Sequence, residues 1–215
     1  MPAGLPKRKA AVEAFYALID ELAKLPAAER EAGERRLRER FEVERAVLVL
    51  DMSQFSLSVQ RHGVVFHLCQ IRRVQALALP IVAAWRGEAV KCEADNILAV
   101  FPRPADAVGA ALSINAALAN AGNDPALGPP LTAGIGIDYG KFLLVPGREA
   151  FGDAVNVAHK LGEDVARASE VLVTDAVRRR LEPTAGIATE HVALSISGLQ
   201  LDAWRILTGH TPAHS

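Results

Sequence analysis

Apolar residues recur along this chain at two spacings, one typical of helices and the other typical of strands. Residues 7–25 and 64–85 place their apolar side chains on one helical face, and Pro80 is expected to bend the second helix or begin a new turn. The same reasoning predicts further helices at 106–120, 152–161 and 175–181. Short apolar runs predict strands at 46–50, 131–138, 141–145 and 170–173, and hairpins at 88–101 and 188–207.

The order of these elements predicts the class of fold. A strand, a helical region, a hairpin, a further helix and a strand form a βαββαβ order, which indicates an α+β sheet with helices on one face. Within it, Tyr139 and Gly140 are expected to turn the chain between two strands, and 146–151 is expected to be a loop. With 215 residues and 50% hydrophobic content, the chain can form one domain with a substantial core and an extension.

Residues 27–45 differ from the rest because they are dense in alternating charge and poor in apolar residues. Glutamates and arginines four positions apart support a solvated helix in this segment. Two interpretations stay open: a surface helix packed on its own domain, or a helical arm that pairs subunits or transmits a signal from a regulatory partner. We expect an N-terminal helical arm at 1–44 and the main domain at 45–215.

Charge and composition exclude several classes of partner. The formal net charge is −1 and aromatic residues make up 5% of the chain, so neither nucleic acid nor an anionic membrane is expected to bind. The N-terminus lacks the apolar run of a signal peptide, and no apolar stretch is long enough to span a bilayer. Cys69 and Cys92 are isolated thiols in apolar settings, which predicts reduced cysteines in the core. These features indicate a soluble cytoplasmic protein.

Two carboxylates stand at the ends of predicted neighbouring strands. Asp51 directly follows the apolar run 46–50, and a carboxylate is a poor continuation for a buried strand. Asp95 lies at the acidic tip of the hairpin predicted for 88–101. Aspartate is common at strand ends and in turns, so each residue alone has an ordinary structural explanation. Together they predict a site for a hard divalent cation.

Three segments in the same region carry a resemblance to a known family, namely LDMSQFS, KCEADNILAVF and FGDAVNVAHKL. Their order and spacing resemble the catalytic domain of the class III nucleotidyl cyclases, from about Arg45 to about Leu207. The resemblance implies a ferredoxin-like core and a metal-dependent adenylate cyclase that converts ATP to 3′,5′-cyclic AMP and pyrophosphate. It also implies a homodimer, because in the family one subunit supplies the metal carboxylates of a site and its neighbour supplies the base-reading residues.

The resemblance assigns roles to five residues of the metal and base sites. It implies that Asp51, Asp95 and the Met52 carbonyl bind two ions per site, Mg²⁺ or Mn²⁺. Lys91 and Glu149 stand at the positions that read the nucleobase. A lysine that donates and a carboxylate that accepts suit adenine, which offers N1 as an acceptor and N6 as a donor. Glu149 is one methylene longer than the aspartate that the family usually has, so base selection stays open.

Two further residues are implied to act on the sugar and the phosphorus. Asn156 stands at the position that orients the ribose, and Lys160 stands where the family has an arginine that stabilises the transition state. Their spacing of four predicts one shared helical face. A lysine keeps the positive charge but lacks the planar fork that grips two phosphate oxygens.

The chain departs from the family at other positions too. Ala94 replaces the usual glycine before the second metal aspartate, and Ser197 replaces a lysine that holds the triphosphate. Arg148 and Arg205 are candidate substitutes for that lysine. Asp138 stands where the family often has histidine, and we have no account of that change.

These departures leave alternatives to an adenylate cyclase. One is a catalytically weak or silent cyclase-like dimer that binds nucleotide or a regulatory partner, and another is a cyclase for a different nucleotide. A diguanylate cyclase is disfavoured because no GGDEF-like segment is present. The histidines lack zinc-site spacing, and surface or packing roles are expected for all of them: His62, His67, His159, His191, His210 and His214.

Overall fold

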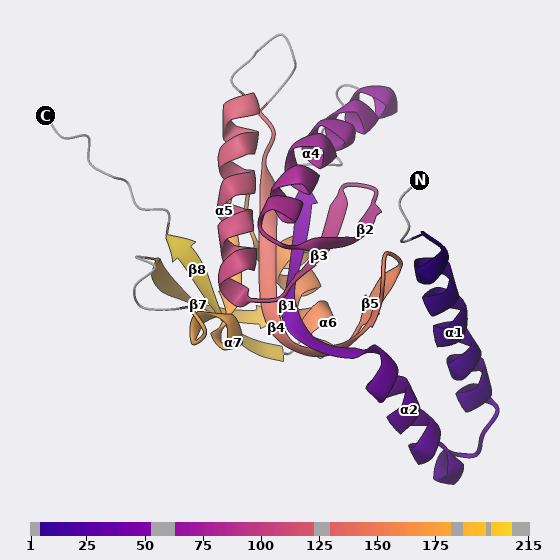
Figure 1. The fold of residues 1–215 in the computed structure, drawn as a ribbon. Coiled ribbons are helices and arrows are strands. Elements are labelled where there is room, and N and C mark those ends of the chain that lie inside the picture. Colours follow the sequence, from indigo (N-terminus) through magenta and orange to yellow (C-terminus); the bar gives the residue numbers. More distant parts are fainter. Residues whose placement is uncertain (1–4, 53–62, 123–129, 182–186, 197–198, 208–215) are drawn as a thin grey trace, which may run out of the picture.

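The computed structural model of the chain describes residues 5–52, 63–122, 130–181, 187–196 and 199–207 (Figure 1). The described helices are α1 (Leu5–Ala23), α2 (Glu31–Phe41), α4 (Val64–Ala84), α5 (Pro104–Ala121), α6 (Asp153–His159) and α7 (Asp175–Arg178), with a 3₁₀ turn η1 (Ala27–Glu29) and a π-helix η3 (Lys160–Val165). The described strands are β1 (Glu42–Met52), β2 (Glu88–Glu93), β3 (Asn96–Phe101), β4 (Ala133–Val145), β5 (Glu149–Phe151), β6 (Val171–Thr174), β7 (Ala188–Ile196) and β8 (Leu199–Leu207). The predicted α+β class and βαββαβ order are confirmed, as β1-α4-β2-β3-α5-β4.

The described strands form one sheet in which β1 is an inner strand. They run in the order β2-β3-β1-β4-β6-β8-β7, with β5 paired to β4 beside this path. β4 and β6 are parallel, whereas β1 is antiparallel to both of its neighbours, β3 and β4. β1 pairs with β4 over its whole length, from Glu42 opposite Leu143 to Met52 opposite Ala133. This central position explains why 46–50 is fully buried and apolar at every residue.

Two predictions near residue 140 are wrong. Tyr139 and Gly140 do not turn the chain, because β4 is one continuous strand of 13 residues that pairs with β1 on both sides of this point. The segment 146–151 is not wholly a loop, since β5 folds back and pairs with the end of β4. Apolar spacing missed both features because the part of β1 that pairs with β4 beyond this point, 42–45, is mostly polar, and because β5 is only 3 residues long.

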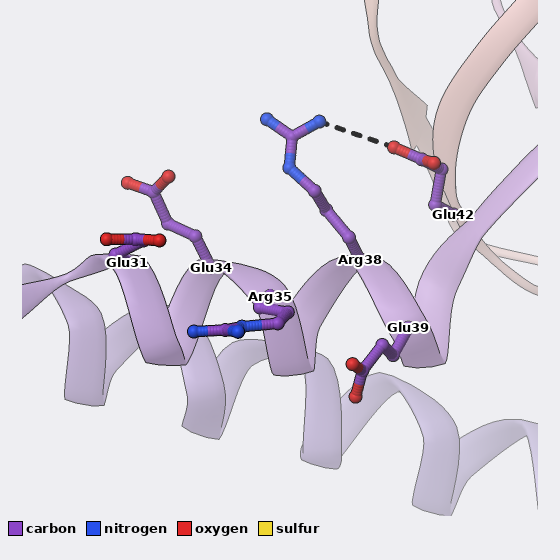
Figure 2. A pocket seen from close by; sticks show the side chains of 6 residues that line it. All are labelled: Glu31, Glu34, Arg35, Arg38, Glu39 and Glu42. Atoms are coloured by element: carbon purple, nitrogen blue, oxygen red, sulfur yellow. Dashed lines mark hydrogen bonds and ion pairs between the residues drawn. The ribbon is translucent and has the colours of Figure 1, made fainter.

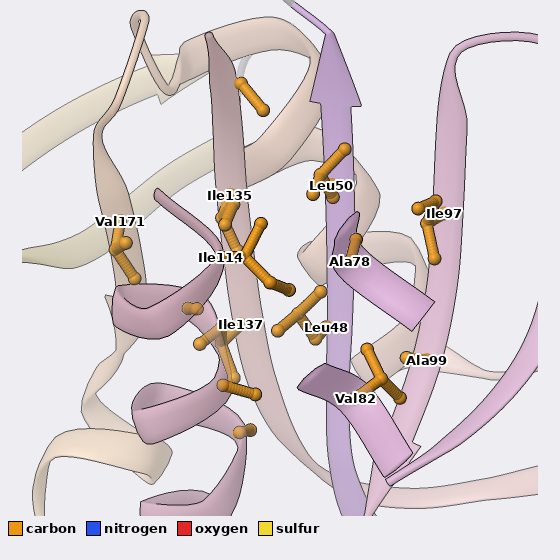
Figure 3. Packing of buried hydrophobic residues seen from close by; sticks show 14 of the residues in the cluster. Leu48, Leu50, Ala78, Val82, Ile97, Ala99, Ile114, Ile135, Ile137 and Val171 are labelled. Carbon is orange, nitrogen blue, oxygen red and sulfur yellow. The ribbon is translucent and has the colours of Figure 1, made fainter. Parts of the chain in front are cut away.

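The two faces of the sheet bury different side chains of β1. Leu48 and Leu50 belong to the cluster formed with α4 and α5 (Figure 3). Val47 and Val49 point the other way and pack with residues of α6. The prediction of helices on one face only is therefore wrong, because every residue of this part of β1 is apolar and both faces need a cover. Full burial of a side chain of this size contributes about 1.5–3 kcal/mol.

Glycines let the α6–η3 segment lie directly on the sheet. A Cβ at Gly136 of β4 would meet the Ala158 carbonyl oxygen and the Gly162 amide nitrogen. A Cβ at Gly162 would lie 2.7 Å from the Val49 carbonyl oxygen of β1. Side chains at either glycine would separate the helix from the strands, so this approach sets the position of the helix that carries Asn156.

The two N-terminal helices lie at the end of the sheet where β5 lies (Figure 1). Phe15 of α1 is buried, with its ring stacked on Phe151 of β5 at 5.7 Å and edge-on to Phe41 of α2 at 5.1 Å. The predicted helix at 7–25 and the predicted charged helix are both confirmed, as α1 and α2. The division at residue 44 stays a prediction, and 42–44 belong to β1.

Neither of the two cysteines is a core residue. Cys69 and Cys92 are both free and both exposed, so the predicted core location is wrong. Cys69 lies on α4 and Cys92 near the end of β2, and the apolar sequence around a cysteine does not determine the side to which its thiol points. Among the described helices, none combines the length and the apolar character that crossing a membrane would require.

Candidate active site

Asp51 and Asp95 lie at neighbouring strand ends, as the sequence pattern predicts. Asp51 is close to the end of β1 and is the strand partner of Asn96, the first residue of β3. Asp95 precedes Asn96 in the two-residue turn that joins β2 to β3. The pairing of β1 with β3 therefore brings together two carboxylates that are far apart in the sequence.

Like charges gather around Asp51. Its pKa is raised to about 7, first by burial and then by the neighbouring carboxylates of Asp95, Glu163 and Asp164. A charged carboxylate in this setting is costly because water is partly excluded and its charged neighbours repel it. A bound divalent cation would relieve both costs, so the electrostatics of this strand end favour a cation.

The donors at this strand end suit a hard cation. Carboxylate and carbonyl oxygens are the ligands that Mg²⁺ and Mn²⁺ prefer. Met52, whose carbonyl is the third implied ligand, is the last residue of β1. Over the described ranges, no group of three or more His, Cys, Asp or Glu side chains is arranged to hold a metal ion. The donor set therefore fits a cation that takes its remaining ligands from water or from substrate oxygens.

The turn that carries Asp95 contains a residue in an unusual conformation. Ala94 has φ = 48°, in the left-handed region that glycine adopts at little cost. For a residue with a Cβ this conformation costs roughly 1–2 kcal/mol. The replacement of the family's glycine is thus accommodated with backbone strain beside Asp95.

Lys91 and Glu149 form a direct ion pair. Lys91 Nζ donates to Glu149 Oε2 at 2.9 Å and also lies 2.5 Å from Glu93 Oε2. The hydrogen bonds to Glu93 and then to Glu149 raise the pKa of Lys91, so the lysine is firmly cationic. The contact depends on β5, which folds back beside β4 and places Glu149 next to β2.

This ion pair lines a cavity of about 290 Å³ between the β2–β3 hairpin and the α6–η3 segment. The cavity wall also includes Leu98 of β3, His159 of α6 and Glu163 of η3. His159 and Glu163 were not predicted as site residues. One signal was available in the sequence, because His159 directly precedes Lys160 and lies three positions after Asn156.

Asn156 and Lys160 lie one turn apart on the same helical segment. Asn156 is an exposed residue of α6, and Lys160 is half-buried where α6 becomes the π-helix η3. The Lys160 amide donates to the Asn156 carbonyl, which confirms the predicted helical spacing. Neither residue is part of the wall of the cavity beside Lys91 and Glu149. The described chain thus brings Lys91 to Glu149 and Asp51 to Asp95, but it does not join Asn156 and Lys160 to either pair.

The two candidate substitutes for the lysine that Ser197 replaces differ in their surroundings. Arg205 lies 2.7 Å from Glu170 and 2.5 Å from Glu190, so its guanidinium is committed to an ion-pair network on the far strands. Arg148 lines a groove of about 450 Å³ together with Lys91, Glu149 and Tyr16 of α1. Ser197 lies outside the described residues.

Asp138 is a buried residue of β4 beneath α6. Its carboxylate accepts hydrogen bonds from the Thr174 hydroxyl and from the Tyr139 amide, the latter at 2.7 Å. Burial raises the pKa of Asp138. These contacts account for a packing role in the link between β4 and β6 and give no role in catalysis.

A second cavity, of about 570 Å³, runs along the charged helix α2 (Figure 2). Its wall consists of acidic and basic side chains only, which are Glu31, Glu34, Arg35, Arg38, Glu39 and Glu42. Arg38 is paired with Glu42 at 3.3 Å. Interleaved charges on an exposed helix are typical of a solvated surface, as the sequence predicts, and we assign no catalytic role to this cavity.

Comparisons with known proteins place this fold. No protein-family model matches the chain. A protein of Rhizobium meliloti (strain 1021) that is provisionally named adenylate cyclase 3 is 26% identical over 132 residues, which is 61% of this chain. The chain spans only 22% of that relative's length.

Solved structures share the fold over most of the chain. The adenylate/guanylate cyclase/hydrolase from Silicibacter pomeroyi has a TM-score of 0.68 and 25% identity, covering 78% of this chain and 98% of that one. The guanylate cyclase domain of RhGC from Catenaria anguillulae, solved with GTP, has a TM-score of 0.66 and 17% identity, covering 77% and 97%. A bacterial light-regulated adenylyl cyclase has a TM-score of 0.65 and 21% identity, covering 77% and 90%. These neighbours include both an enzyme named as an adenylyl cyclase and one named as a guanylate cyclase.

Proposed function

We propose that this chain, which has the fold of the class III nucleotidyl cyclase catalytic domain, is an adenylate cyclase that converts ATP to 3′,5′-cyclic AMP and pyrophosphate. The observation that carries the proposal is the contact of Lys91 with Glu149 at 2.9 Å, on a cavity next to the hairpin that bears Asp95. A donor beside an acceptor matches N1 and N6 of adenine.

In this reaction the ribose 3′ oxygen attacks the α-phosphorus, the bond from that phosphorus to the bridging oxygen of pyrophosphate breaks, and the 3′ hydroxyl loses its proton. Divalent cations held by Asp51 and Asp95 would lower the pKa of that hydroxyl and neutralise charge on the leaving group. Lys91 and Glu149 would orient the base, and Asn156 would orient the ribose. Lys160 would place a positive charge near the phosphorus.

We propose that the active unit is a homodimer with its sites at the subunit interface. One chain contains both the metal pair, Asp51 and Asp95, and the base-reading pair, Lys91 and Glu149. By the resemblance to class III cyclases, the two pairs belong to different sites, each completed by the second subunit. Sedimentation of the purified protein should therefore show a dimer whenever cyclase activity is present.

The activity is tested by incubating the purified protein with ATP and Mn²⁺ or Mg²⁺ and measuring cyclic AMP. Asp51→Ala and Asp95→Ala should each lower the rate by about 10²-fold or more while the fold is retained. Asp202→Ala is the matched control, because Asp202 is an exposed carboxylate on β8 that pairs with His191. Asp51→Ala and Asp95→Ala variants that remain as active as the parent would show that the metal assignment is wrong.

A second candidate function is nucleotide binding without turnover. It is favoured by Lys160 at the arginine position and by the strained Ala94 beside Asp95. Calorimetric binding of ATP with no cyclic product would support this function over the enzyme. Lys160→Arg should raise the rate several-fold if the site is an active but weakened cyclase. A competition assay with all four nucleoside triphosphates distinguishes a cyclase for another nucleotide from these two functions, because it identifies the triphosphate that is cyclised.

A further inference from the structure

His159 has a fixed hydrogen-bond partner inside the cavity of the Lys91–Glu149 pair. Its Nδ1 lies 2.7 Å from Glu163 Oε1, and the Asn96 side-chain amide donates to the same oxygen at 2.7 Å. His159 and Glu163 are each about one-third exposed, at 36% and 35% of their side chains. Both therefore face the cavity and can be reached by a ligand.

This partner determines which nitrogen of His159 is free. An ionised carboxylate accepts a hydrogen bond from the nitrogen that it contacts, so Nδ1 carries the hydrogen in the neutral ring. The lone pair then lies on Nε2, which becomes a hydrogen-bond acceptor. Asn96 also fixes Glu163, since its side-chain amide donates to the oxygen that already receives Nδ1.

The acceptor complements the two groups already assigned to the base. Lys91 supplies a donor and Glu149 an acceptor, and an exocyclic amino group has two hydrogens to donate. Glu149 can take one hydrogen and His159 Nε2 the other. Leu98 contributes an apolar side chain to the same cavity wall, as expected for a site that receives the face of a base.

We propose that His159, oriented by Glu163, is a third residue of the nucleobase site and accepts a hydrogen bond from the exocyclic amino group of the bound purine. The inference rests on the proposed function, because it takes the cavity of Lys91 and Glu149 to be the base site. Adenine offers this amino group at N6 and guanine offers it at N2, so the ligand class is a purine that carries an exocyclic amino group.

The test compares ATP with purine riboside triphosphate, which lacks the 6-amino group, in the parent protein and in His159→Ala. The parent should favour ATP by about tenfold in kcat/KM, and the variant should lose about threefold of that preference by losing activity on ATP alone, while the Glu149 contact retains the rest. His159→Gln, which can present a carbonyl acceptor, should recover part of the preference. A parallel test compares GTP with inosine triphosphate, which lacks the 2-amino group. If His159→Ala changes only this second ratio, the amino group that His159 contacts is that of guanine.

Glu163→Ala should reduce the same preference, because the ring is then free to change its tautomer and its orientation. His191→Ala is the matched control: His191 also pairs with a carboxylate, Asp202 at 2.9 Å, but on the β7–β8 hairpin. It should leave both ratios unchanged. If His159→Ala retains the parent's preference on both purine pairs, the proposal is overturned.

Calorimetric titration with the same four nucleotides separates this proposal from the proposed function. If the parent binds ATP better than purine riboside triphosphate, if His159→Ala reduces that difference, and if no cyclic product is formed, the base assignment stands and the cyclase activity does not. If cyclic AMP is formed but neither ratio depends on His159, the activity stands and the base assignment fails.

Discussion

Lys91 and Glu149 are 58 positions apart in the sequence, yet their side chains form a hydrogen bond of 2.9 Å. The contact arises because β5 turns back along β4, which places Glu149 beside the edge strand β2. Two residues that the sequence associates only through a family resemblance are thus partners in space. Their role in reading the base stays a proposal, and it makes a direct prediction.

Glu149→Gln should weaken the discrimination between ATP and GTP. An amide at this position can donate as well as accept, so it no longer rejects the guanine O6 acceptor, and we expect the ratio of kcat/KM values to fall by about tenfold. Glu93→Gln is the control, because Glu93 also contacts Lys91 but is mostly exposed, at 70%. An unchanged ratio in Glu149→Gln, or an equal loss in Glu93→Gln, would contradict the assignment of the acceptor.

Stability without metal should depend on Asp51 and on pH. The folded-state pKa of Asp51 is about 7 against an ordinary value of 3.8, so between these values the folded state binds more protons than the unfolded state. The free energy of unfolding in a chelator should therefore fall as pH rises from about 4 to 7, with a slope of at most about 1.4 kcal/mol per pH unit.

Asp51→Asn should weaken the dependence of the unfolding free energy on pH, and urea unfolding at several pH values measures that dependence. Mg²⁺ or Mn²⁺ competes with the proton for the same carboxylate, so either ion should raise the unfolding temperature more at pH 8 than at pH 5.5. Equal stabilisation of the parent and Asp51→Asn by the ion would be evidence against a cation at this position.

Ala94→Gly should relieve strain at the turn that carries Asp95. Removing the Cβ at φ = 48° recovers about 1–2 kcal/mol, and the greater freedom of glycine in the unfolded chain costs about 0.4–1 kcal/mol. We expect a net gain of about 0.5 kcal/mol in unfolding free energy, together with higher cyclase activity. Ser169→Gly, at another positive φ of 64° in the turn before β6, should give a similar gain in stability and no gain in activity. A loss of activity in Ala94→Gly would mean that the strained turn is needed.

Gly136→Ala should displace the helix that carries Asn156 and Lys160. The added methyl would meet backbone atoms of Ala158 and Gly162, which cannot move aside as a side chain can, and we expect a loss of roughly 1–3 kcal/mol in stability with loss of activity. Gly140→Ala, on the same strand, places its methyl 3.4 Å from the Ala154 Cβ and should be nearly neutral. Chemical denaturation of both variants decides the matter, and equal effects would argue against a contact specific to Gly136.

Much of the fold follows from local patterns. The helices at 7–25, 64–85 and 106–120 and the closing hairpin are confirmed because each buries an apolar face whose spacing is local. The errors concern polar or short strands, such as the first half of β1, whose structure depends on a partner strand. The thiols of Cys69 and Cys92 were misplaced for a similar reason, since the apolar sequence around a residue does not determine which way that residue points.

By itself the sequence determined that Asp51 ends a buried strand, that Asp95 lies at the tip of a hairpin and that Asn156 and Lys160 share a helical turn, because each follows from short-range periodicity. The pairing of β1 with β3, which makes the two carboxylates neighbours, belongs to the tertiary structure. Only the tertiary structure decided that Glu149 reaches Lys91, that helices cover both faces of the sheet, and that His159 and Glu163 enter the same cavity. These features depend on how β4, β5 and the π-helix fold against β1 and β2, and such long-range packing leaves no periodic signal in the residues that it brings together.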